Sequence, residues 1–159
     1  MKMLFWLAVL TLYATIAFAD AAADAKAHSE AFARAANAQD VKAVLALYAD
    51  DARVIWPGQG EEAKGKAAVE QLVTASLKAF PKDSRIVLKS QEATPLGNGY
   101  IATVGQWEQS FTGPDGKPQT VEVRTTELIK KQGAKTLYVV DHASIGMPPA
   151  PQPRGSEGK

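Results

Sequence analysis

The chain has 159 residues, of which 46% are hydrophobic and 22% are charged, and it contains no cysteine. This composition predicts a folded single-domain protein rather than a disordered or disulfide-stabilised one. The 18 Lys and Arg residues nearly balance the 17 Asp and Glu residues, and no basic run supplies the excess charge that nucleic acid binding needs. We therefore expect no nucleic acid partner. The lack of cysteine also excludes thiolate metal sites and cysteine nucleophiles.

The first 19 residues have the pattern of a secretory signal peptide. Lys2 precedes an uncharged apolar run from Leu4 to Phe18, and Ala17 and Ala19 are small residues of the kind that a signal peptidase recognises. The alternative is a membrane anchor, but the run is shorter than the roughly 20 residues that a membrane span needs. We predict cleavage after Ala19, a periplasmic or secreted protein, and no stable membrane anchor after cleavage.

The next part of the chain is helical in pattern. An alanine-rich stretch and two stripes of apolar residues predict helices over Asp24–Ala36, Val41–Tyr48 and Lys66–Phe80. Between the second and third helices, Arg53–Trp56 is predicted to be a short strand, followed by a polar loop over residues 59–65. Pro81 ends the third helix.

From residue 84 the apolar residues alternate with polar ones, which predicts strands. The predicted strands are Arg85–Thr94, Tyr100–Thr112, Gln119–Lys131 and Thr136–Ile145. Short turns connect them, so we expect an antiparallel meander that buries one face against the helices, an α+β arrangement. Residues 148–159, rich in Pro and Gly, are predicted to form a disordered tail, so the domain spans residues 20–147.

Two turns allow the strand registers to be predicted. If Asp115-Gly116 and Gly133-Ala134 are two-residue turns, Asp141 lies on the helix-covered inner face and Arg124 is its diagonal neighbour. The residues expected on that face are Gly105, Trp107, Gln109, Arg124, Thr126, Leu128, Val139, Asp141 and Ala143.

A buried Asp141 needs a charged or hydrogen-bonding partner, and the predicted register supplies Arg124. Trp107, beside them, would add a cation–π contact with the guanidinium. Two interpretations stay open at this point. The pair is either a structural ion pair of the sheet or the polar floor of a ligand pocket.

The opposite face of the predicted sheet is too apolar for a surface that only meets water. Tyr138, Val140 and His142 on the last strand are joined there by Val121 and Val123 on the neighbouring strand. We predict that a second copy of the chain covers this face and makes a homodimer.

Several short motifs resemble the SnoaL-like group of the nuclear transport factor 2-like superfamily, which is also called ketosteroid-isomerase-like. They are Asn37–Val41, Leu47–Ala52, Pro57-Gly58, Gly65–Val69, Arg124–Thr126 and Asp141–Ser144. The resemblance implies a cystatin-like roll, in which a cone of curved antiparallel sheet wraps around helices and encloses a pocket. It also implies a homodimer built on the outer face of the sheet. The superfamily contains both enzymes and binding domains, so the resemblance implies no single activity.

Two enzymatic groups of the superfamily can be compared with this sequence by position. Ketosteroid isomerases have a base carboxylate where this chain has Trp56, and oxyanion-binding residues where it has Phe32 and Thr126. The pattern of limonene-epoxide hydrolases is matched by Arg124 and Asp141, but Thr126 stands where a second carboxylate belongs. Only half of a known catalytic site is therefore expected.

The two histidines suggest no metal site. His28 lies in the alanine-rich helix, where we expect a solvated position, and no cluster has the spacing of metal ligands. His142 is predicted to have a structural or dimer-interface role. We predict neither a metal nor a cofactor.

Two hypotheses about function follow. In the first, an exported protein binds a small apolar or cyclic molecule in a pocket lined by Phe32, Trp56, Trp107, Gln109, Arg124, Thr126 and Asp141. In the second, an isomerase or epoxide-hydrolase-like enzyme uses Asp141 and Arg124 as catalytic residues. The number of carboxyl groups in the pocket discriminates between them, because such chemistry usually needs two acids and the predicted inner face supplies one.

Overall fold

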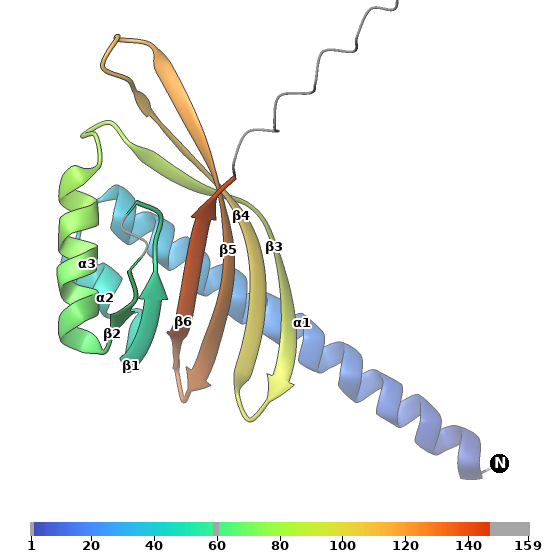
Figure 1. The fold of residues 1–159 in the computed structure, drawn as a ribbon. Helices are drawn as coiled ribbons and strands as arrows, with labels where there is room; N and C mark the ends of the chain where they lie inside the picture. The colour runs from blue at the N-terminus through green and yellow to red at the C-terminus, as the bar shows by residue number, and fades with distance from the viewer. Residues whose placement is uncertain (1, 59–60, 147–159) are drawn as a thin grey trace, which may run out of the picture.

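Three helices cover one face of a curved six-stranded sheet (Figure 1). The computed structural model describes residues 2–58 and 61–146, with side chains from Asp20 onward. The helices are α1 (Lys2–Asn37), α2 (Val41–Leu45) and α3 (Lys66–Ala79). The strands are β1 (Tyr48–Ile55), β2 (Ala63–Lys64), β3 (Arg85–Gly97), β4 (Tyr100–Thr112), β5 (Pro118–Gln132) and β6 (Lys135–Ile145).

The strands lie in the order β2-β1-β6-β5-β4-β3. The long strands β3 to β6 form the predicted antiparallel meander, and the α+β fold class is confirmed. One pair departs from the prediction, because β1 is parallel to β6. The chain can make this parallel pair because α3 and the meander separate the two strands in sequence.

Both chain ends carry predictions that the structure does not test. The predicted cleavage point after Ala19 falls inside α1, whose N-terminal part extends beyond the sheet (Figure 1). The predicted tail over residues 148–159 lies outside the described residues. In the described part of the chain, no helix combines the length and the apolar character needed to cross a membrane.

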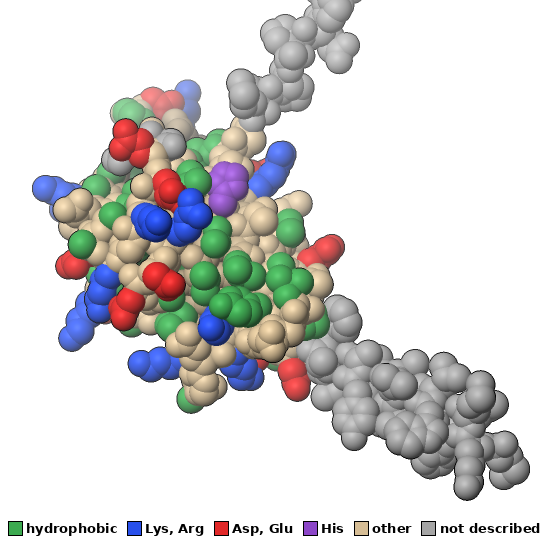
Figure 2. All heavy atoms as spheres, turned by 60° about the horizontal axis from the view of Figure 1, so that its bottom comes forward, with side chains coloured by type: hydrophobic (Ala, Val, Ile, Leu, Met, Phe, Trp, Pro, Cys, Tyr) green, Lys and Arg blue, Asp and Glu red, His purple; other side chains and the backbone are tan. Residues whose placement is uncertain are grey.

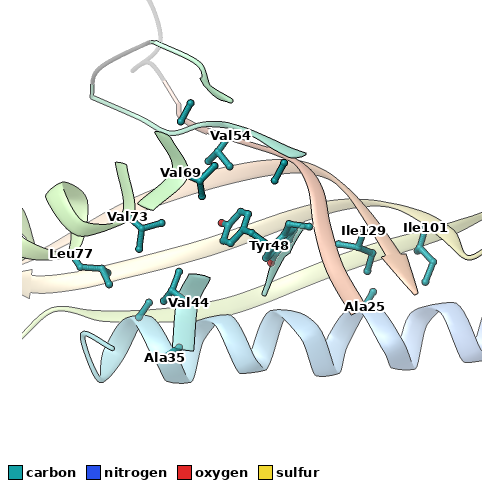
Figure 3. Packing of buried hydrophobic residues seen from close by; sticks show 14 of the residues in the cluster. Ala25, Ala35, Val44, Tyr48, Val54, Val69, Val73, Leu77, Ile101 and Ile129 are labelled. Atoms are coloured by element: carbon teal, nitrogen blue, oxygen red, sulfur yellow. The ribbon is translucent and has the colours of Figure 1, made fainter. Parts of the chain in front are cut away.

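The core lies between the helices and the inner face of the sheet (Figure 3). On α3, Val69, Val73 and Leu77 are buried at a spacing of four residues, which places them on one side of the helix. On α1 the buried positions include Ala25 and Ala35, and these small side chains allow the helix to lie close to the strands.

The second helix is shorter than predicted. Asp40 caps it by accepting a hydrogen bond from the Ala43 amide at 2.9 Å, but the helix ends at Leu45, and Tyr48 already belongs to β1. The Tyr138 amide of β6 donates to the Leu47 carbonyl at 2.8 Å, so pairing with β6 replaces the last predicted turn of the helix. The predicted loop over residues 59–65 also contains the short strand β2, which pairs with β1.

The β4–β5 hairpin closes at Gly113 and Lys117, so these two residues enclose a loop of three residues, 114–116, rather than the two predicted. The Gly116 amide donates to the Gly113 carbonyl at 2.9 Å, and the Gly113 amide donates to the Lys117 carbonyl at 2.8 Å. Gly116 has a φ of 75°, in the left-handed region that glycine adopts without strain. Such a loop is a tight turn followed by a left-handed residue, the common geometry of three-residue hairpins.

This extra loop residue shifts the β4–β5 register by one, so the inner-face placement of Arg124, Thr126 and Leu128 is wrong. Trp107 pairs with Val123 rather than with Arg124, which pairs with Gln106 instead. Because a shift of one residue moves every side chain to the other face of a strand, Arg124 and Thr126 are exposed on the outer face. The predicted Arg124–Asp141 ion pair does not form.

The β5–β6 turn was predicted correctly, since Gln132 pairs with Lys135, but a bulge at Val139 changes the register beyond it. Two side chains three positions apart, Tyr138 and Asp141, consequently both face inward and are buried. The burial of Asp141 on the inner face confirms the prediction for that residue. Tyr138, Val121 and Val123 were predicted on the outer dimer face, and these placements are wrong. Val123 lines the inner side of the sheet, and Val121 pairs with the inward-facing Gln109.

The observed register predicts that Arg124→Met changes the free energy of unfolding by no more than about 0.5 kcal/mol, because the side chain is exposed and pairs with no buried charge. Chemical denaturation measures this. A loss of about 3 to 5 kcal/mol, the usual consequence of breaking a buried ion pair, would contradict the register.

Candidate functional site

A cavity of about 180 Å³ lies between the helices and the inner face of the sheet. Of the predicted ligand-binding residues, Phe32, Trp56, Trp107, Gln109 and Asp141 line it, whereas Arg124 and Thr126 do not. The other lining residues come from α1, α3, the strands and the segments next to them, and they are Ala36, Pro57, Ser76, Leu77, Phe80, Ile86, Glu108, Val123, Thr125, Glu127, Tyr138, Ala143 and Ile145.

Asp141 is the buried carboxyl group that β6 contributes to the cavity. Its Oδ2 accepts a hydrogen bond from the Tyr48 hydroxyl at 2.5 Å and another from the Trp56 indole Nε1 at 2.8 Å. Both donors belong to β1 or follow it directly, so the parallel β1–β6 pair positions them. Burial raises the pKa of Asp141, and the hydrogen bonds from Tyr48 and Trp56 oppose that rise.

Glu127 is a second buried carboxyl group that the sequence analysis did not identify. It pairs with Asp141 across the β5–β6 ladder, and its side chain lines the same cavity. Its Oε2 accepts a hydrogen bond from the Thr103 hydroxyl at 2.5 Å. Burial and the nearby Asp141 charge raise the pKa of Glu127 to about 7.

The two carboxyl groups titrate as a pair, because two like charges so close together in a buried site disfavour ionisation of both. The pKa values of both Glu127 and Asp141 are raised, and neither group has a cationic hydrogen-bond partner among the described residues. Near neutral pH, therefore, the two carboxyl groups share a proton that they can donate to a bound molecule or accept from it. Such a pair can act as a general acid and a general base.

Aromatic side chains make up much of the rest of the cavity wall. Phe32 on α1 lies edge to face with Trp56, Trp107 and Tyr138, with ring centroids 5.9, 5.9 and 6.1 Å apart. This arrangement is the preferred geometry of aromatic pairs. The placement of Phe32, Trp56 and Trp107 agrees with the sequence analysis, and their role in ligand binding stays a prediction.

Gly105 leaves the space that one of these rings needs. The Trp107 indole Nε1 donates to the Thr125 hydroxyl at 3.2 Å, and a Cβ at position 105 would lie 2.6 Å from that hydroxyl oxygen. The glycine therefore allows the indole and the threonine to meet on the inner face.

His28 is buried rather than solvated, which corrects the sequence prediction. It is 5% exposed, and its ring contacts that of Tyr138 with centroids 4.2 Å apart. Burial lowers the pKa of His28 to about 4, so the imidazole is neutral at neutral pH. On the same helix turn, the Ser29 hydroxyl accepts a hydrogen bond from Gln91 at 2.8 Å.

The remaining site predictions have mixed outcomes. The epoxide-hydrolase-like pattern fails because Arg124 points away from the cavity and Thr125 and Glu127 point toward it. Gln109 lines the cavity and donates a hydrogen bond to the Ser84 hydroxyl at 2.8 Å. His142 is exposed, and its predicted interface role stays a prediction. Among the described residues, no three His, Asp or Glu side chains are grouped as metal ligands.

Comparison with known proteins identifies the family. Residues 29–135 match the SnoaL-like domain. The chain belongs to the SnoaL-like family. Among solved structures, it resembles a ketosteroid isomerase-like protein from Erwinia carotovora atroseptica with a TM-score of 0.66 and 21% identity, over 79% of this chain and 96% of that one. It also resembles a nuclear transport factor 2-like protein with a cystatin-like fold from Novosphingobium aromaticivorans, with a TM-score of 0.71 and 15% identity, over 84% and 90% of the two chains.

These two likenesses show the fold, and they agree with the fold that the sequence motifs implied. A curated relative, UvrABC system protein A of Helicobacter pylori, is 33% identical over 87 residues. The match covers 53% of this chain but only 9% of that protein, so it assigns no activity to this SnoaL-like domain.

The raised pKa of Glu127 predicts how stability depends on pH. The folded protein keeps the Glu127 proton up to about pH 7, whereas the unfolded chain releases it near 4.5. Deprotonation therefore favours the unfolded state, and the Glu127 contribution to stability falls by about 3 kcal/mol as the pH rises from 4.5 to above 7. His28 contributes in the opposite direction between about pH 4 and 6.5, since only the unfolded chain protonates it there.

The comparison of wild type with Glu127→Gln isolates the first effect. We expect the difference in unfolding free energy, wild type minus variant, to decrease with rising pH across this window. A difference that is constant or that increases with pH would mean that Glu127 is not protonated in the folded state.

Proposed function

We propose that this SnoaL-like protein binds a small, mostly apolar molecule with a single ring in the cavity between its helices and its sheet. The observation that carries the proposal is a cavity of about 180 Å³ whose wall combines five aromatic side chains with two buried carboxyl groups. A dry apolar cavity of about 150 Å³ holds one benzene molecule, so the volume suits one ring with a small substituent. Apolar walls with a few polar groups are typical of ligand sites.

This proposal predicts saturable binding of toluene, followed by the fluorescence of Trp56 and Trp107 in the cavity wall. Ala143→Leu, which adds volume inside the cavity, should weaken binding at least tenfold. Ala102→Leu makes the same change on the outer face and should leave binding unaltered. Equal binding by both variants would contradict the assigned site. Native mass spectrometry of protein from its own host would identify the natural ligand.

A second candidate function is proton transfer to and from the bound molecule. The specific observation in its favour is the position of Glu127 opposite Asp141, since one protonated and one ionised carboxyl group provide the acid and the base. Glu127 and Asp141 are thus the candidate catalytic residues, instead of the Asp141 and Arg124 suggested by the sequence. Uptake of deuterium from heavy water by a bound cyclic ketone, lost in Glu127→Gln, would separate catalysis from simple binding.

We also propose that the protein is exported and that its mature chain begins near Asp20. In support, the first buried side chain in the described part of α1 is Ala21, and Asp24 pairs with Lys131 of β5 at 2.5 Å. Cleavage after Ala19 would thus keep the helix residues that contact the sheet. The mass of the chain recovered outside the cytoplasm tests the cleavage point, and a chain that keeps residues 1–19 would contradict it.

A homodimer through the outer face of the sheet is proposed as well, with corrected residues. The register aligns Ala102, Leu128 and Val140 across β4, β5 and β6. The next row runs from Val104 on β4 through Thr126 on β5 and His142 on β6 to Ile55 on β1. Apolar side chains gathered on one surface are visible in Figure 2, with charged side chains around them. Such a patch supports an interface, because a second copy would remove it from water.

This arrangement predicts a dimer at about 10 to 100 μM protein, the range for an interface of modest affinity. Val140→Asp should convert it to a monomer in analytical ultracentrifugation, because it places a charge within the patch. Val87→Asp, on the edge strand β3, is the matched control and should remain dimeric. A wild-type monomer under these conditions would contradict the interface.

A further inference from the structure

The cavity is acidic and has no basic side chain in its wall. Glu127 and Asp141 line it and are each 4% exposed, whereas the described lining residues include no Lys, Arg or His. A third lining acid, Glu108, already faces a cation, because its carboxylate lies 3.4 Å from the Lys89 ammonium. The two buried carboxyl groups therefore determine the charge of the cavity.

In the described part of the chain, the groups that donate hydrogen bonds to these two carboxyl groups are all neutral. Asp141 accepts from a phenol and an indole, those of Tyr48 and Trp56, and Glu127 accepts from the hydroxyl of Thr103. Buried carboxylates are usually balanced by a positive charge, because removing an isolated ion from water is unfavourable. Here the fold satisfies their hydrogen bonds, but no cation among the residues that the structure describes is paired with them.

Four basic side chains on α1, β5 and β6 do not supply that cation. Arg124 is on the outer face, and Lys131 is paired with Asp24. His142 follows Asp141 in the chain but is exposed on the opposite face of β6. His28 is buried beside Tyr138, where it stays neutral above about pH 4. Among the described residues, none of these four side chains brings a positive charge into the cavity, so we look for that charge in a ligand.

The aromatic part of the wall suits such a ligand. Phe32, Trp56, Trp107 and Tyr138 form a contiguous group of rings next to the carboxyl groups, and Trp56 itself donates to Asp141. Aromatic rings attract cations through their π electrons, and sites that recognise quaternary ammonium groups are lined by such rings. The same rings bury the apolar part of a ligand.

We propose that the ligand of this cavity is a protonated amine carried on a single small ring, with its ammonium group against Asp141 and Glu127 and its ring among the aromatic side chains. The inference rests on the proposed function and names the ligand class for the same cavity. The ammonium group would supply the missing positive charge and would donate hydrogen bonds to both carboxyl groups. A neutral ligand would leave that charge uncompensated, and an anionic one would be repelled.

Four probes of similar size test the ligand class with the full-length chain at pH 7: benzylamine, benzyl alcohol, toluene and benzoate. We expect benzylamine to bind at least tenfold more tightly than benzyl alcohol, and benzoate to bind most weakly, as measured by calorimetry and by NMR. Asp141→Asn and Glu127→Gln should each remove most of the preference for benzylamine over benzyl alcohol. Glu92→Gln, an equal charge change at an exposed position of β3, should preserve the preference.

The outcomes separate the two proposals. Binding of toluene and benzyl alcohol without a preference for benzylamine would overturn the ligand class and leave the proposed binding function intact. Failure of all four probes to bind would overturn the binding function itself. If Asp141→Asn does not fold, Glu127→Gln carries the test, and a preference for the amine that persists in this folded variant would contradict the proposal.

Discussion

The site depends on two carboxyl groups that lie on paired residues inside a mostly apolar cavity, with no cation among the described residues that line it. Glu127 and Asp141 are held on neighbouring strands, and the fold supplies each with neutral hydrogen-bond donors. An arrangement of this kind disfavours the charged state of the two carboxyl groups, and such perturbed groups cluster at functional sites. The negative charge of the pair must be offset either by a proton or by a positively charged ligand. A proton on the pair would serve proton transfer, whereas a positively charged ligand corresponds to amine binding.

The same pair explains why distant elements of the chain meet at the cavity. Asp141 joins β6 to the β1 region through Tyr48 and Trp56, and Glu127 joins β5 to Thr103 on β4. Phe32 brings the N-terminal helix to the rings of the wall. The polar contacts and the aromatic packing therefore converge on one volume. This convergence supports a ligand site at that cavity.

The sequence predicted the fold class, the long strands, the burial of Asp141 and most of the aromatic wall, because alternation and short turns report these features directly. It did not identify Glu127, because the two-residue turn that we predicted at Asp115-Gly116 placed Arg124, rather than Glu127, on the inner face. Two signals could have corrected this: Pro114 before Asp115-Gly116 suits a three-residue loop, and the alternate β5 residues from Val121 to Ile129 are the more apolar set. The bulge at Val139 and the role of Tyr48 depend on packing between strands far apart in the chain, so local pattern could not predict them.

The central claim, that Glu127 and Asp141 share a proton near neutral pH, is tested most directly by following their side-chain carboxyl carbons by NMR across a pH titration of the folded, ligand-free protein. We predict that one carboxyl group titrates close to pH 7, that the resonances of both residues respond to this step, and that it disappears in Glu127→Gln. If both carboxyl groups complete their titration below about pH 5, the range of unperturbed acids, the pair is fully ionised at neutral pH and the account is contradicted.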